Sequence, residues 1–160
     1  MVLVIPLDRP FSFTAPGEPL VRTGTFLRGL VVSVHDGGTL TVLIGERKET
    51  VRLIGIDAPE LDQAPSGLQA RDVLRGLVEG KTVRLETDVA VRDQNKRLLA
   101  YVFAGDLFVN LEMLRQGRAL VSTVPPNVAH EEEYRKAQEE ARLAGRGVWC
   151  YRKRQKGQEC

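Results

Sequence analysis

Three segments with strand character follow one another between Phe26 and Ile56, and only short turns separate them. The first ends at Val34, and a turn containing the adjacent glycines Gly37 and Gly38 leads into a second that ends at Ile44. Two glycines between alternating segments are typical of a tight hairpin turn. The third segment is TVRLIGI, which is apolar enough to be largely buried and follows a polar loop over residues 45–49. This succession predicts antiparallel hairpins.

The hydrophobic period changes after residue 60, where helices alternate with two more strands. Ser66 and Gln69 have the spacing of a capping box, and the helical pattern that follows them stops at Gly80. Residues 81–87 and 97–103 alternate as strands. Asn110 is expected to cap a short helix, LEMLRQ.

A final helix is predicted over residues 131–144, because it opens with three glutamates and ends before a glycine. Its buried face is expected to contain Tyr134, Ala137, Ala141 and Ala144. The fold class is therefore predicted as α+β: a five-stranded Greek-key barrel of the oligonucleotide-binding (OB-fold) type, with three helices.

The domain organisation is predicted from composition. Residues 1–26 form an N-terminal extension, 27–150 one compact domain, and 151–160 a basic C-terminal tail that is expected to be solvated. Met1–Leu7 is too short and lacks the basic start of a signal peptide or membrane span. The two cysteines, Cys150 and Cys160, either pair or remain two thiols.

Charge gives little guidance to function. The chain has 23 basic and 21 acidic residues, for a formal net charge of +2. That balance is too mild to indicate a nucleic-acid binder on its own.

The segment RLIGIDAPE places chemistry at the end of the third strand. A half-buried strand arginine such as Arg52 needs an anionic partner. Pro59 fixes the backbone between Asp57 and Glu60, so the two carboxylates hold a defined relation. Such a pair suits a hard cation or acid–base catalysis, and it equally suits a charged connection between a strand and a helix.

Arg97 is a second arginine at the start of an apolar strand. Two strand-borne arginines with paired carboxylates are the groups needed for metal-assisted phosphodiester hydrolysis. Taken alone, each arginine also fits a surface ion pair.

The chain resembles the staphylococcal nuclease (thermonuclease) family. The resemblance rests on VVSVHDGGTLTV, VRLIGIDAPE, GLQARDVLRGLVEGKTVRLE, RLLAYVF and FVNLEMLRQGRALV, in family order, and it extends to Trp149. It implies an OB-fold barrel with three helices and a calcium-dependent nuclease that hydrolyses DNA and RNA, preferably single-stranded, as a monomer without a membrane association.

The resemblance also implies roles for individual residues. Arg52 and Arg97 match arginines that contact the scissile phosphate and stabilise the transition state, and Lys96 is expected to assist them in binding substrate. Glu60 matches the glutamate that activates or positions the attacking water.

The implied metal ligands include one departure from the family pattern. Asp57 matches a calcium-ligating aspartate, the carbonyl of Ala58 a backbone ligand, and Asp36 an aspartate of the outer coordination shell. The family turn reads Asp-Gly-Asp-Thr, whereas here Gly38 stands at the second aspartate, a direct ligand. Asp36 is a candidate substitute ligand. Tyrosines that contact nucleotide in the family are replaced by Asn95 and Ser122.

Three interpretations of Gly38 remain open. The chain is a working nuclease with weakened calcium affinity, or a catalytically impaired domain that binds nucleic acid or a protein partner. Alternatively the glycine mainly removes repulsion among the carboxylates and stabilises the fold. Export from the cytoplasm, to the cell envelope or the medium, is slightly favoured by family habit.

Overall fold

The computed structural model describes residues 24–160, so most of the predicted N-terminal extension lies outside the described residues. Five strands form a closed barrel: β1 (Phe26–Asp36), β2 (Thr39–Ile44), β3 (Arg47–Leu53), β5 (Thr82–Glu86) and β6 (Leu98–Ala104). They pair in the order β3-β2-β1-β5-β6. A parallel pairing of β3 with β6, in which Arg52 faces Leu99, closes the barrel.

Buried and more exposed residues alternate along these strands, and the buried side chains fill the barrel interior. In β3 the residues Glu49, Val51 and Leu53 are buried while their neighbours are exposed or half-buried. β1 carries register shifts after Val31 and Val34, which are bulges of the kind that bend a strand around a barrel. The predicted loop over 45–49 is shorter than expected, since only Gly45 and Glu46 form the turn.

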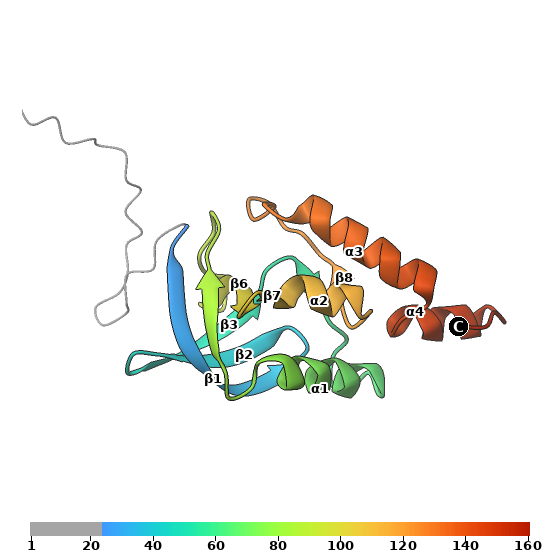
Figure 1. Cartoon of the computed structure of the whole chain (residues 1–160), viewed down its shortest axis with the longest axis horizontal. Helices are drawn as coiled ribbons and strands as arrows, with labels where there is room; N and C mark the ends of the chain where they lie inside the picture. The colour runs from blue at the N-terminus through green and yellow to red at the C-terminus, as the bar shows by residue number, and fades with distance from the viewer. Residues whose placement is uncertain (1–23) are drawn as a thin grey trace, which may run out of the picture.

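In the described part of the chain there are four helices: α1 (Ser66–Val78), α2 (Val109–Arg115), α3 (Glu131–Ala144) and α4 (Val148–Gln155). Helices α1, α2 and α3 lie on one side of the barrel, and α4 lies beyond the end of α3 (Figure 1). Short strands complete the fold: β7 (Leu107–Phe108) pairs with β6, and β4 (Ile56–Asp57) pairs with β8 (Leu120–Val121). The α+β OB-type barrel is as predicted, but it has one helix more than expected.

The additional helix, α4, covers much of the predicted basic tail. Composition indicated a solvated segment, and residues 151–160 are nearly all exposed, but a disulfide joins Cys150 in the first turn of α4 to Cys160 beyond its end. The guanidinium of Arg152 lies 4.7 Å from the centre of the Trp149 ring. These two local contacts give the helix partners that a charge count does not reveal.

Three local expectations were wrong. Ser66 makes no side-chain cap, because the residue at the N-cap of α1 is Pro65. Ala144 is exposed, because α3 ends there and only Tyr134, Ala137 and Ala141 are buried on it. Asn110 does not cap α2 either, since Phe108 is at the N-cap and Asn110 lies within the helix, fully buried.

Asn110 instead satisfies buried backbone groups. Its Oδ1 accepts a hydrogen bond from the Val102 N–H at 2.9 Å, and its Nδ2 donates to the Ile54 carbonyl at 3.1 Å. The Tyr134 hydroxyl donates to the same Ile54 carbonyl at 2.7 Å. The next residue, Gly55, has a φ of +78° and packs under the Tyr134 ring, where a side chain would collide. Helices α2 and α3 therefore hold the corner between β3 and β4.

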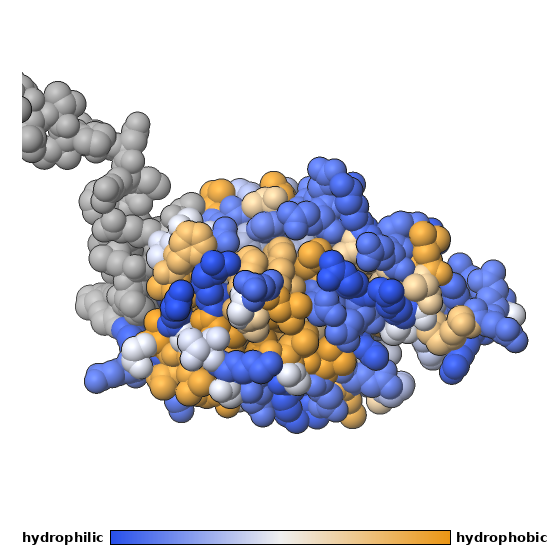
Figure 2. Space-filling view, in the orientation of Figure 1, coloured by the Kyte–Doolittle hydropathy of each residue, from blue (hydrophilic) through white to orange (hydrophobic). Residues whose placement is uncertain are grey.

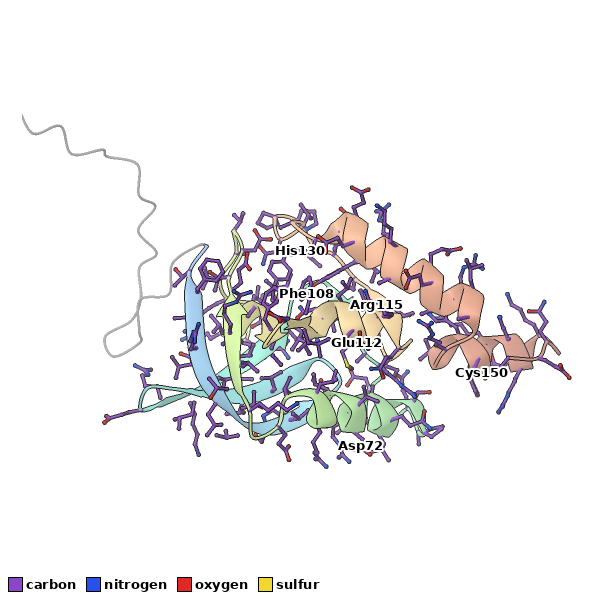
Figure 3. The ribbon with its side chains drawn as sticks, in the orientation of Figure 1. Asp72, Phe108, Glu112, Arg115, His130 and Cys150 are labelled. Carbon is purple, nitrogen blue, oxygen red and sulfur yellow. A yellow bond between two sulfur atoms is a disulfide. The ribbon has the colours of Figure 1, made fainter. Side chains whose placement is uncertain are left out.

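An aromatic cluster fastens the start of α3 to the barrel. The His130 ring lies 4.5 Å from Tyr101 and 4.9 Å from Phe108, measured between ring centres. Figure 3 shows Phe108 and His130 on neighbouring elements at this point. Among the described residues, no helix is both long and apolar enough to cross a bilayer.

We predict that Asn110→Ala lowers the free energy of unfolding by about 2–4 kcal/mol, because buried backbone groups lose their partners. Urea unfolding measures the loss. Asn95→Ala serves as the control, since Asn95 is exposed and should change stability by less than about 0.5 kcal/mol. Equal stability of the two variants would show that the Asn110 bonds contribute nothing net.

Candidate active site

The turn between β1 and β2 closes on itself through Asp36. Oδ1 of Asp36 accepts a hydrogen bond from the Gly38 N–H at 2.8 Å. This contact spans two residues and is typical of an aspartate that stabilises a turn. The Gly38 carbonyl points the other way and accepts from the Leu53 N–H at 2.9 Å. The turn is thereby tied to the end of β3.

Arg52 joins that turn to the corner between β3 and β4. Its Nη1 donates to the Gly38 carbonyl at 3.0 Å, and its Nη2 donates to the Ile56 carbonyl at 3.1 Å. Nη2 also lies 3.6 Å from Oδ1 of Asp57, and the Arg52 side chain is only 23% exposed. A guanidinium has five N–H donors, so three remain beyond these two backbone bonds within the described structure. The arginine is held in place and can still bind an anion.

Gly38 leaves the space that Arg52 occupies. A Cβ placed on Gly38 would overlap Nη1 of Arg52. The obstacle is the far end of a flexible side chain, and the φ of Gly38 is outside the left-handed region. The glycine is therefore required by the position of the guanidinium and not by the backbone of the turn.

Asp57 and Glu60 lie on the connection that follows β4. Asp57 is 65% exposed, and Glu60 is exposed as well. The backbone of Glu60 is fixed twice by Gln63, whose Oε1 accepts from the Glu60 N–H while its N–H donates to the Glu60 carbonyl, both at 2.9 Å. Gly67, at the start of α1, packs so closely on the Glu60 carbonyl that a Cβ would overlap it.

Arg97 is positioned by Asp93, a residue that sequence reasoning missed. Nε of Arg97 lies 2.6 Å from Oδ2 of Asp93, and Oδ1 of Asp93 accepts from the N–H groups of Asn95 and Arg97, each at 2.9 Å. Burial alone would raise the pKa of Asp93, but the hydrogen bonds and charge of Arg97 hold that pKa below its usual value. An aspartate that starts a polar turn four residues before an arginine was the available signal.

Lys96 lies in the same turn and is exposed, with a φ of +61°. Its carbonyl accepts from Nη1 of Arg92 at 2.9 Å. Arg92 in turn forms a bidentate ion pair with the buried Glu49 on β3, at 3.0 and 3.1 Å. The Arg92–Glu49 ion pair thus joins the turn before β6 to the barrel wall.

The fold brings Arg52, Arg97 and Asp36 to one end of the barrel. Arg52 stands near the end of β3, and Arg97 immediately precedes Leu98, which pairs with Val51 on β3. Asp36 reaches the same region through Gly38. In residues 24–160, no three His, Cys, Asp or Glu side chains converge as a ready metal centre. The donors are of the right kind for a hard cation, namely carboxylates and the Ala58 carbonyl, but they carry few charges.

Asn95 and Ser122, which replace the tyrosines expected from the family pattern, form hydrogen bonds through their backbone N–H groups. Asn95 lies in the turn that Asp93 organises, and its side chain is exposed. The Ser122 N–H donates to the Gly55 carbonyl at 2.8 Å, which joins β8 to the corner beside Asp57.

Comparison with known proteins shows the family of this chain. The family model described as staphylococcal nuclease homologue matches residues 50–151. A thermonuclease of Staphylococcus intermedius is 32% identical over 147 residues, covering 87% of this chain and 88% of the relative. An uncharacterized endonuclease of Haemophilus influenzae is 40% identical over 75% of this chain and 65% of its own length, and one of Escherichia coli is 36% identical over 77% of each. The chain belongs to the staphylococcal nuclease family.

Proposed function

We propose that this chain is a calcium-dependent nuclease that hydrolyses phosphodiester bonds of DNA and RNA, with a preference for single strands. The observation that carries the proposal is the pair of arginines fixed at one end of the barrel. Arg52 is held by two backbone carbonyls and Arg97 by Asp93, so neither must be ordered when substrate binds. Preorganised donors of this kind stabilise charge that develops in a transition state.

The mechanism assigns a separate task to each residue. Arg52 and Arg97 donate to the non-bridging oxygens of the scissile phosphate as negative charge accumulates on them, and exposed Lys96 contributes to substrate binding. Glu60, whose backbone is fixed while its carboxylate faces solvent, takes the proton of the attacking water. Calcium would be held by Asp57, the Ala58 carbonyl and Asp36, and when bound it neutralises charge on a phosphate oxygen.

Gly38 affects the metal more than the chemistry. The missing carboxylate lowers the charge of the calcium site, and ligand charge helps to set calcium affinity. Oxygens of the substrate phosphate can supply part of that missing charge. We therefore expect weak calcium binding by the free protein and stronger binding when nucleic acid is present.

A second candidate is a domain that binds nucleic acid without cleaving it. The absent Gly38 side chain favours this alternative, whereas the organised positions of Arg52, Arg97 and Glu60 favour catalysis.

The disulfide between Cys150 and Cys160 is typical of oxidising compartments. The proposal therefore includes action outside the cytoplasm, and it takes the protein to act as a monomer.

We predict that the wild-type protein cleaves fluorogenic single-stranded DNA with saturable calcium dependence, and that Glu60→Gln lowers kcat by about 10²- to 10⁴-fold because it removes the general base. Binding of the oligonucleotide, followed by fluorescence anisotropy, should be retained. Glu46→Gln is the matched control, since Glu46 is exposed in the turn between β2 and β3. Binding without any calcium-dependent cleavage by wild type would instead support the second candidate.

We predict that Gly38→Asp raises calcium affinity by about ten- to a thousandfold, because it restores a carboxylate at the cost of moving the end of Arg52. Isothermal titration calorimetry measures this affinity directly. Gly38→Asn displaces Arg52 equally but adds no charge, so it should not reproduce the gain. An unchanged calcium affinity in Gly38→Asp would show that the glycine does not cause weak calcium binding.

We predict that Asp93→Asn lowers kcat/KM for single-stranded DNA by roughly ten- to a hundredfold, because Arg97 loses its ion pair and its fixed position. Steady-state kinetics measure the effect. Asp106→Asn removes one exposed acidic charge elsewhere and is the control. Full activity in Asp93→Asn would show that the placement of Arg97 does not depend on Asp93.

A further inference from the structure

A pocket of about 420 Å³ begins at the candidate active site and extends to α4. Its lining includes Asp57 and Ala58 of the candidate active site and Tyr151 and Arg152 of α4. Its volume is within the range of about 300–1,000 Å³ that is typical of small-ligand sites. Figure 1 shows α4 beyond the end of α3, and Figure 2 shows that this C-terminal part of the chain protrudes from the body of the domain.

The two α4 residues have the chemistry that recognises a nucleotide. Tyr151 is 57% exposed, so its ring face is accessible for stacking. Arg152 follows it directly and supplies a guanidinium, and the lining also includes the apolar Pro59 and Leu120. An aromatic face beside a cation is the usual platform for single-stranded nucleic acid.

The platform is fastened to the body of the domain. The Val148 N–H donates to the Gly117 carbonyl at 2.9 Å, at the end of α2. Gly117 and Gly147 pack so closely that a Cβ on either would overlap the backbone opposite. The Cys150–Cys160 disulfide ties the chain that follows α4 back to the first turn of the helix. Tyr151 and Arg152 therefore keep a defined place relative to Asp57.

Charge favours a polyanion at this place. Arg152 lines the pocket, and the first turn of α4 carries no acidic residue. Asp57 is the one acidic residue on the described lining of the pocket, and a cation bound there would offset it. A strand whose scissile phosphate lies at Arg52 can continue past Asp57 into a neutral-to-basic groove.

We propose that this pocket is a subsite for a nucleotide beyond the two that flank the cleaved bond, with its base stacked on Tyr151 and its phosphate bound by Arg152. The inference rests on the proposed nuclease function and extends it from one phosphate to a longer strand. The subsite predicts that affinity depends on substrate length, because a dinucleotide occupies the active site without reaching α4.

The test compares oligonucleotides of two and eight nucleotides, extended on either the 5′ or the 3′ side of the bond. Binding is measured by fluorescence anisotropy with calcium in Glu60→Gln protein, which retains the strand uncleaved. Tyr151→Ala should raise the Kd of the octanucleotide about 5- to 150-fold, as expected for one lost base stack. Tyr151→Phe should bind as the parent does, and the dinucleotide should not distinguish the variants.

A charge-matched pair on the same helix tests the phosphate contact. Arg152→Gln should reduce the slope of log K against log salt by about 0.7, the value for one single-strand phosphate. Arg154→Gln removes the same charge from an exposed residue outside the lining of the pocket and should leave the slope unchanged. Equal slopes for the two variants would overturn the role of Arg152.

Parallel cleavage assays with proteins that keep Glu60 intact separate this inference from the proposed function. If the octanucleotide is cleaved normally and bound equally by Tyr151→Ala, the subsite is wrong while the nuclease stands. If nothing is cleaved but Tyr151→Ala loses octanucleotide binding, the subsite stands on a binding domain. Equal losses for two and eight nucleotides would also overturn the subsite.

Discussion

The Arg52 guanidinium is the contact on which the site depends. It donates hydrogen bonds to the Gly38 carbonyl in the turn between β1 and β2 and to the Ile56 carbonyl beyond β3, and so links the two segments directly. Asn110 and Tyr134 hold the same corner from the opposite side through the Ile54 carbonyl. One arginine thus assembles the loops and presents its remaining donors where a phosphate would bind.

This placement accounts for the glycine at position 38. Arg52 lies over Gly38 so closely that a side chain there would displace it. The glycine leaves room for a fixed arginine close to Asp57, and in the proposed calcium site it removes one carboxylate. In the proposed mechanism Arg97, held by Asp93, completes the phosphate site with Arg52. Metal binding and substrate binding are therefore expected to support one another.

Local patterns predicted the barrel and the strand that carries Arg52, since alternation and glycine turns depend on neighbouring residues alone. The start of α3 at Glu131 was equally readable. Asn110 was misread because an asparagine near a helix start suits both a cap and a buried bridge, and only tertiary packing decides. Helix α4 was not predicted, because its basic residues indicated a solvated tail and composition left the Cys150–Cys160 bond undecided. The roles expected for Arg52, Asp57 and Glu60 came from family resemblance, whereas Asp93 and Gln63 became visible only with the fold in place.

Coupling between calcium and nucleic acid tests the account most directly. Calcium would be titrated into wild-type protein by calorimetry, alone and with a cleavage-resistant phosphorothioate single strand. Because binding free energies are reciprocally linked, a phosphate that supplies missing ligands must strengthen calcium binding as much as calcium strengthens binding of the strand. The account predicts at least about a tenfold gain in calcium affinity with the strand present. Equal calcium affinities with and without the strand would contradict it.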